Sequence, residues 1–261
     1  MSSLPLAGKV AIVTGSSRSI GAAIVTQLAS DGASVIVNYV NDAGAAEHIV
    51  AAIATEGNGK AVAVKADAST LVGAQTLVDA CIKAFGKLDI LVLNAGIMGS
   101  KPIAAIDEKF YDAHMNANVK GPLFLTKLAA PLLPSGGRVI FFSTTLAHAS
   151  GVMPIHLVYC ASKGAIEQIA RVLAKDLGAR GITVNTVSPG PTDTELFRKG
   201  KTDEMINMFA GFAPSKRLGQ PDDIAPVVAF LASEGARWVN GQNILVNGVR
   251  DNFLSSRLLL G

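Results

Sequence analysis

Hydrophobic runs alternate with helical patterns along almost the whole chain. Short runs rich in Val, Ile and Leu predict buried strands at residues 10–13, 34–39, 61–66, 88–93, 138–143, 182–187 and 243–247. Apolar residues at helical spacing predict helices near 20–30, 43–56, 70–85, 107–130, 158–178 and 221–233. Near-continuous apolar strands separated by helices are typical of a parallel sheet covered on both faces. The pattern predicts an α/β fold with a doubly wound, seven-stranded, mostly parallel sheet.

No repeat, linker or low-complexity segment divides the chain, so we expect one domain over residues 1–261. Doubly wound sheets bind ligands at the carboxyl ends of their strands, where the strand order reverses. Polar and glycine-containing segments follow the predicted strands at Gly15, Asp67, Asn94, Ser143 to Thr145 and Pro189. These segments predict a ligand site along that edge.

Composition narrows the possible partners and location. With 49% hydrophobic and 16% charged residues, the chain of 261 residues is too apolar for a disordered protein. The net charge is only +3 and the basic residues are scattered, so we expect no nucleic-acid partner. The run at 10–13 is too short to span a membrane, and the N-terminus lacks a signal-peptide pattern. The histidines lack metal-ligand spacing. Two cysteines, Cys81 and Cys160, are expected as reduced thiols in a cytoplasmic protein.

Tyr159 and Lys163 stand four residues apart in the predicted helix 158–178 and therefore on one face of it. A tyrosine has an ordinary pKa near ~10, and a neighbouring positive charge favours its phenolate. The pair therefore points to proton transfer at a carbonyl or alcohol oxygen. Such a pair also arises by chance in many helices.

The N-terminal segment predicts a dinucleotide-binding unit. A strand ending at Thr14 leads into the turn TGSSRSIG and then into the helix 20–30. Gly15 and Gly21 let the backbone turn tightly, while the first amides of the helix favour a pyrophosphate. The pattern is TGxxxGxG, except that Ser19 occupies the middle glycine slot.

Five motifs occur in a fixed order: the glycine turn, the NAG run at 94–96, the NVKG run at 118–121, the Tyr159/Lys163 pair and the Pro-Gly at 189–190. Their order and spacing resemble those of the short-chain dehydrogenase/reductase family. The resemblance covers the chain from about residue 6 to about residue 248. It favours the branch of 3-ketoacyl-carrier-protein reductases and fungal polyketide-ketone reductases. It implies reversible hydride transfer between NADP(H) and a small-molecule carbonyl or alcohol, and a homotetramer or homodimer with the helices near 107–130 and 158–178 at one interface.

The resemblance also assigns catalytic roles. Tyr159 would be the acid/base, and Lys163 would lower its pKa and bind the nicotinamide ribose. Asn118 would hold a proton-relay water, with the nearby Asn116 as the rival. Thr144 would orient the substrate, although counting backwards from the tyrosine favours Thr145 and leaves Ser143 possible.

The choice of NADP rests on the end of the second strand, where NAD enzymes usually carry an acidic residue. Asn38 and Tyr39 stand there instead. A neutral amide would not repel a 2′-phosphate, and Arg18 could supply positive charge to it. Against this, Arg18 could be a solvated surface residue, and Asp42 lies close by in the chain.

The complete expected cofactor site follows from the same resemblance. Asp67 would contact the adenine, although a surface turn explains it equally well, and Thr192 and Thr194 would hold the nicotinamide end unless they only cap a helix. The expected residues are Gly15, Ser17, Arg18, Ser19, Ile20, Asn38, Tyr39, Asp67, Asn94, Ala95, Gly96, Tyr159, Lys163, Pro189, Gly190, Thr192 and Thr194.

Residues 191–216 mix methionine, phenylalanine and charges, as expected of a lid over a substrate. Met205, Met208, Phe209 and Phe212 would line the pocket or pack within the lid. At the C-terminus, Val249 replaces the final glycine of the family's NGG ending.

The sequence disfavours two other functions. In related enoyl reductases six residues separate the tyrosine and the lysine, whereas three do so here, which disfavours reduction of a carbon–carbon double bond. A non-catalytic dinucleotide sensor would be favoured by loss of Tyr159 or Lys163, and both are present.

Overall fold

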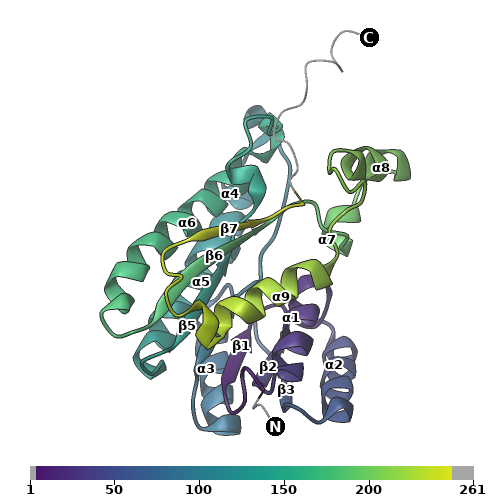
Figure 1. Ribbon diagram of the computed structural model, residues 1–261. Coiled ribbons are helices and arrows are strands. Elements are labelled where there is room, and N and C mark those ends of the chain that lie inside the picture. Colours follow the sequence, from purple (N-terminus) through teal and green to yellow (C-terminus); the bar gives the residue numbers. More distant parts are fainter. Residues whose placement is uncertain (1–3, 249–261) are drawn as a thin grey trace.

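The computed structural model describes residues 4–248, so Val249 and the tail beyond it lie outside the described residues. Within this part of the chain, seven strands form one sheet in the order β3-β2-β1-β4-β5-β6-β7 (Figure 1). Every strand pairing described is parallel. The strands are β1 (Val10–Val13), β2 (Ser34–Tyr39), β3 (Ala61–Lys65), β4 (Ile90–Leu93), β5 (Arg138–Phe142), β6 (Thr183–Pro189) and β7 (Asn243–Val246). The predicted α/β fold is confirmed.

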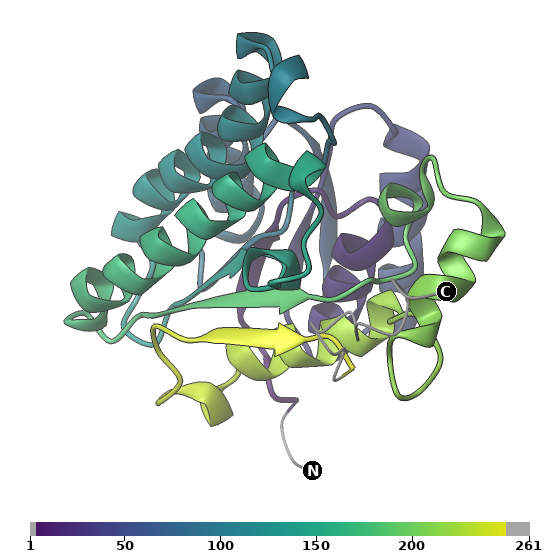
Figure 2. The ribbon, with the colours of Figure 1, turned by 90° about the horizontal axis from the view of Figure 1, so that it is seen from above.

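Helices cover both faces of this sheet. Figure 2, seen from above, shows α6 and α9 on opposite sides of β6 and β7. One face carries α1 (Ser19–Ser30), α2 (Ala43–Glu56) and α9 (Pro221–Ala232). The other carries α3 (Leu71–Phe85), α5 (Gly121–Ala129) and α6 (Leu157–Gly178). The short helix α4 (Glu108–Met115) precedes α5, while α7 (Glu195–Arg198) and α8 (Asp203–Gly211) follow β6.

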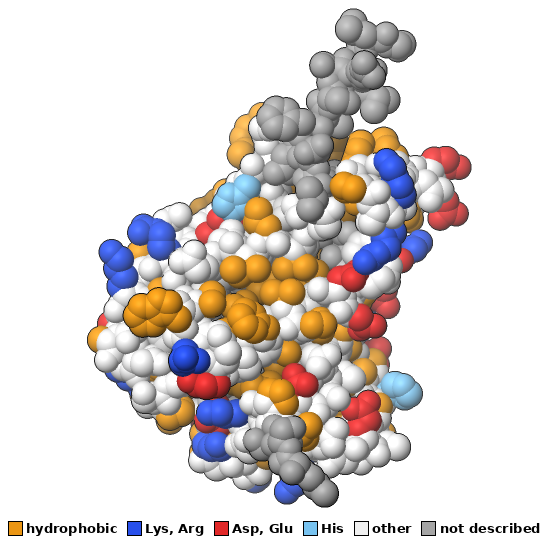
Figure 3. Space-filling view, viewed as in Figure 1, with side chains coloured by type: hydrophobic (Ala, Val, Ile, Leu, Met, Phe, Trp, Pro, Cys, Tyr) orange, Lys and Arg blue, Asp and Glu red, His pale blue; other side chains and the backbone are white. Residues whose placement is uncertain are grey.

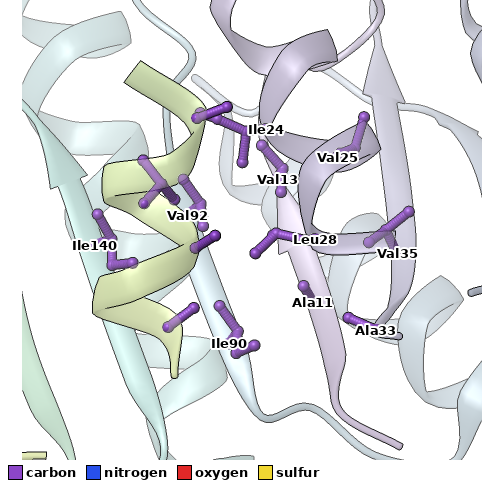
Figure 4. Packing of buried hydrophobic residues seen from close by; sticks show 14 of the residues in the cluster. Ala11, Val13, Ile24, Val25, Leu28, Ala33, Val35, Ile90, Val92 and Ile140 are labelled. Carbon is purple, nitrogen blue, oxygen red and sulfur yellow. The ribbon is translucent and has the colours of Figure 1, made fainter. Parts of the chain in front are cut away.

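The core follows from the alternation of side chains along each strand. In β1, Ala11 and Val13 point to the face under α1 and α9, whereas Val10 and Ile12 point to the opposite face. Figure 4 shows Ile24, Val25 and Leu28 of α1 packed on the first of these faces. Because both faces are buried, the strands have near-continuous apolar sequences.

The strand order reverses at β1, which lies between β2 and β4. The chain builds one half of the sheet outward to β3 and then crosses back to β4. Such a switch point opens a crevice at the carboxyl ends of the two central strands. The glycine turn after β1 and the NAG run after β4 therefore meet at one place.

The predicted helix near 107–130 is interrupted. Between α4 and α5, residues Asn116–Lys120 form a π-helical turn, in which the Gly121 N–H bonds the Asn116 carbonyl. Pro122 follows and has no N–H to donate to the carbonyl of Asn118, its normal α-helical acceptor. Turns of this kind are frequent at functional sites.

No helix in residues 4–248 is long and apolar enough to cross a membrane.

Candidate active site

The glycine turn after β1 leaves the start of α1 open to an anion. Gly15 has a φ of +63°, a conformation that favours glycine, and a Cβ on Gly21 would overlap the Gly15 carbonyl oxygen. No side chain caps the N-terminus of α1, which also has no acidic residue in its first turn. Unpaired amides at a helix N-terminus favour phosphate groups. Ser19 also has a positive φ, +53°, so this slot adopts the left-handed backbone even without glycine.

Asn94 fastens this turn to the end of β4. Its side-chain amide donates to the carbonyl oxygens of Thr14 and Gly15, at 2.9 and 3.1 Å. The Thr14 hydroxyl accepts from the Ala95 N–H at 2.9 Å. The side chain of Asn94 therefore holds the backbone of the turn.

Asn38, expected at the cofactor site as a neutral amide that does not repel a 2′-phosphate, is bonded within the protein. The residue is 1% exposed, its Oδ1 accepts from the Gly15 N–H at 2.9 Å, and its Nδ2 donates to the Ala66 carbonyl at 2.9 Å. These bonds use the amide within the protein, so Asn38 braces the glycine turn. A carboxylate here would lose the Nδ2 donor.

The residues expected around the adenosine end are open to solvent to different degrees. Arg18 is largely exposed and forms an ion pair of 3.0 Å with Glu195 of α7. Asp67 is exposed, and its carboxylate accepts hydrogen bonds from the N–H and the hydroxyl of Ser69. These two bonds close a turn, which was the alternative role expected for Asp67. Tyr39, at the end of β2, is half-buried.

Tyr159 projects from the first turn of α6 and lies beside the Thr144 hydroxyl, which acts to lower the pKa of the phenol. Of the three hydroxyls considered at the end of β5, Thr144 is the one beside the phenol. Ser143 points elsewhere, to Glu167 at 2.6 Å. Thr145 is 4% exposed.

Lys163 lies one helical turn after Tyr159 and is 5% exposed. Its Nζ donates to the Phe142 carbonyl at 2.8 Å. Burial lowers the pKa of Lys163 to about 8.

The expected lowering of the pKa of Tyr159 by Lys163 is not what the structure gives. Burial raises the pKa of Tyr159 to about 12, although the bond with Thr144 works in the opposite direction. The physical reason is that desolvation disfavours the phenolate, while the ammonium of Lys163 is directed at the Phe142 carbonyl. The phenol of Tyr159 is therefore protonated at neutral pH.

Asn118 lies in the π-helical turn and is 1% exposed. Its side chain accepts from the Ile97 N–H at 2.9 Å and donates to the Ile97 carbonyl and the Ser162 hydroxyl, both at 3.0 Å. A Cβ on Gly96 would lie 3.0 Å from Asn118 Oδ1 and 3.2 Å from Lys163 Nζ. The NAG run, Asn118 and Lys163 are thus brought together.

The segment after β6 completes the edge. Gly190 donates its N–H to Val246 at 2.9 Å, and a Cβ on it would overlap Asn247. Thr192 is 5% exposed, and its hydroxyl donates to the Gly190 carbonyl at 3.0 Å. Thr194 caps α7 by accepting from the Phe197 N–H, as its alternative role predicted.

The lid segment has its own aromatic cluster. Phe209 packs edge-on against Phe197 and Phe212, with ring centroids 5.5 and 6.1 Å apart. Met205 and Met208 are instead 41% and 48% exposed.

Two groups near the site were missed from the sequence. His156 is 8% exposed, and its Nδ1 contacts the Ser100 hydroxyl at 3.2 Å. Glu167 contacts Ser143 and His148. Glu167 follows Lys163 by four residues, a spacing that could have identified it.

These residues fit a dinucleotide with NADP chemistry. The uncapped start of α1 suits a pyrophosphate, and Arg18 suits a further phosphate. The glycines at 15, 21 and 96 let the turn, the NAG run and the Asn118–Lys163 region pack closely, because a Cβ at any of them would crowd these protein atoms.

Comparison with known proteins agrees with this geometry. A family model described as enoyl-(acyl carrier protein) reductase matches residues 15–248. An uncharacterized oxidoreductase of Methylorubrum extorquens is 45% identical over 93% of this chain and 98% of its own. A probable tetrahydroxynaphthalene reductase of Zymoseptoria tritici is 41% identical over 93% of this chain and 94% of its own.

Among solved structures, the angucycline C-6 ketoreductase LanV with bound NADP superimposes with a TM-score of 0.87 and 38% identity, covering 94% of this chain and 96% of its own. The chain belongs to the short-chain dehydrogenase/reductase family. It is an oxidoreductase of that family.

Proposed function

We propose that the protein is an NADPH-dependent reductase of a ketone or aldehyde carbonyl, acting reversibly. The observation that carries this proposal is the Thr144 hydroxyl beside the Tyr159 phenol, one helical turn from the buried Lys163. Two hydroxyls so placed can both bond one carbonyl oxygen. Their position at the carboxyl edge of the sheet adjoins the proposed dinucleotide site.

NADPH, when bound, supplies the hydride. Tyr159 donates the proton that the developing alkoxide requires, and Thr144 donates a hydrogen bond to the same oxygen. A pKa of about 12 keeps Tyr159 protonated at neutral pH, which suits a proton donor in the direction of reduction. The reverse oxidation needs the phenolate and should be favoured at high pH.

Lys163 and Asn118 resupply the proton. With a pKa of about 8, Lys163 can exchange a proton near neutral pH, and it is one helical turn from the phenol. The Asn118 carbonyl lacks its α-helical donor because Pro122 has no N–H, so it can accept from a water. We propose that such a water connects Lys163 to the solvent.

The substrate proposed is a ketone on an aromatic or polycyclic framework. This rests on the similarity to proteins named tetrahydroxynaphthalene reductase and angucycline C-6 ketoreductase. The exposed Met205 and Met208 of the lid suit a flat apolar ligand, since thioethers pack well on rings.

Replacing Tyr159 by Phe tests the proposal. Removal of the hydroxyl should lower kcat for NADPH-dependent carbonyl reduction by about 100-fold or more, because general acid catalysis contributes that much. The Kd for NADPH should change less than threefold. Tyr111→Phe is the matched control, since Tyr111 is 47% exposed on α4, and it should behave as wild type. Full activity of Tyr159→Phe would overturn the assignment.

A dinucleotide sensor is not favoured, because such a protein has no need for the Tyr159–Thr144 contact. Enoyl reduction, named in the description of the matching family model, is disfavoured by the three residues between Tyr159 and Lys163.

We also propose self-association as a homotetramer or homodimer, in the cytoplasm. Exposed apolar side chains support association: Val172 is 56% exposed on α6, and Trp238 is 96% exposed before β7. Figure 3 shows hydrophobic side chains gathered on the face that carries β7 and α9. Light scattering of the purified protein tests the proposal, and a monomer at all concentrations would refute it. For the location, the support is that Cys81 and Cys160 are free thiols, as is usual in a reducing compartment.

A further inference from the structure

Three residues at successive turns of α6 contact three successive residues at the end of β5. Tyr159 lies beside the Thr144 hydroxyl, and Lys163 donates to the Phe142 carbonyl at 2.8 Å. Glu167 accepts from the Ser143 hydroxyl at 2.6 Å. The contact at the middle residue, Ser143, is thus made by Glu167 and not by the proposed catalytic side chains of Tyr159 and Lys163.

The Glu167 carboxylate is held from a second direction. Its side chain is 11% exposed, and its Oε2 lies 2.8 Å from the His148 Nε2 in the loop after β5. The same nitrogen lies 2.9 Å from the Asn243 side chain of β7, which accepts from the Ser188 hydroxyl at 2.7 Å. A nearly buried carboxylate is costly unless its oxygens are bonded. Here Oε1 accepts from Ser143 and Oε2 lies beside the His148 imidazole, so the carboxylate is approached by residues on either side of Thr144 in the sequence.

We propose that Glu167 is a positioning residue for the reaction. Its carboxylate anchors Ser143 to α6 and thereby fixes the tripeptide 142–144, which supplies the acceptor for Lys163 and the partner of Tyr159. The Ser143 hydroxyl is also 3.3 Å from the Lys163 carbonyl, so the anchor lies on the lysine's own turn. This inference rests on the proposed carbonyl reduction.

Because a displacement of a catalytic group by about 1 Å can cost about 100-fold in rate, loss of the anchor should act on turnover more than on binding. Glu167→Ala should lower kcat at least tenfold and leave the KM for NADPH within threefold. Glu167→Gln keeps an oxygen that accepts from Ser143, and it should recover most of that loss. Asp176→Ala removes an exposed carboxylate from the same helix and should stay within twofold of wild type.

The test measures these constants on the full-length chain, with hydrogen exchange of residues 142–150 as a readout that needs no turnover. Faster exchange there in Glu167→Ala, but not in Asp176→Ala, is expected. Ser143→Ala gives a second test should Glu167→Ala fold poorly, and it should also lower kcat. An unchanged kcat with unchanged exchange in Glu167→Ala overturns the inference. If wild type reduces no carbonyl, the proposed function fails, and the exchange rates alone decide whether Glu167 anchors the strand.

Discussion

Lys163 should make the folding stability of the protein depend on pH. Its ammonium is 5% exposed, and burial lowers its pKa from 10.5 to about 8. Since one pKa unit is worth ~1.4 kcal/mol, this shift corresponds to about 3 kcal/mol of destabilisation while the amine is charged. Below pH 8 the folded and unfolded chains both hold this proton, and the penalty is fully present. Between about pH 8 and 10.5 the unfolded chain binds more protons, so the free energy of unfolding rises with pH.

Urea unfolding of wild type and Lys163→Met at pH 7.0 and 9.5 measures this effect. Linkage predicts that wild type gains about 2 kcal/mol more than the variant over this interval. The variant leaves the Phe142 carbonyl without its donor, but that cost is the same at both pH values and cancels. Tyr159, with a pKa of about 12, stays protonated throughout. An equal pH dependence in the two proteins would refute the depressed pKa.

Three further substitutions test the cofactor site. Ser19→Gly relieves a left-handed backbone at φ +53° and should raise the free energy of unfolding by about 0.5–1 kcal/mol and Tm by about 2 °C, measured by thermal unfolding; a lower Tm would contradict this. Asn38→Ala leaves the Gly15 N–H and the Ala66 carbonyl unpaired and should cost about 2–4 kcal/mol in urea titration; a cost below about 1 kcal/mol would show that Asn38 does not brace the turn. Arg18→Ala should weaken NADPH binding about tenfold or more in a fluorescence titration while leaving NADH binding and stability almost unchanged, because the Arg18–Glu195 pair is exposed. An equal loss for both cofactors would exclude a 2′-phosphate role.

The sheet could be predicted from the sequence because both of its faces are buried. The run at 10–13, for example, has no polar residue and is followed by the glycine turn, so its limits agree with β1. The helix at 158–178 likewise agrees with α6 within one residue. The turn at Asn118 could not be predicted from hydrophobic spacing, because a π-helical turn shifts the register without removing the pattern. Pro122 was its only local signal.

The sequence predicted the positions of the candidate site residues better than the orientations and partners of their side chains. Asn38 was correctly placed at the end of its strand, but whether its amide faces the ribose or the glycine turn depends on the Ala66 carbonyl, 28 residues away. The pKa of Tyr159 depends on burial, which helix spacing does not report. Glu167 was missed because its partners, Ser143 and His148, come from a loop whose path the sequence does not reveal.

The central claim is that a carbonyl, rather than a carbon–carbon double bond, is reduced with NADPH. The most direct measurement is the fall in reduced-nicotinamide absorbance with a hydroxylated polycyclic aromatic ketone and, in parallel, with an enoyl thioester, followed by mass spectrometry of the products. We predict NADPH oxidation with the ketone and an alcohol product, and no reaction with the thioester. Reduction of the enoyl thioester alone, with the ketone unchanged, would contradict the account.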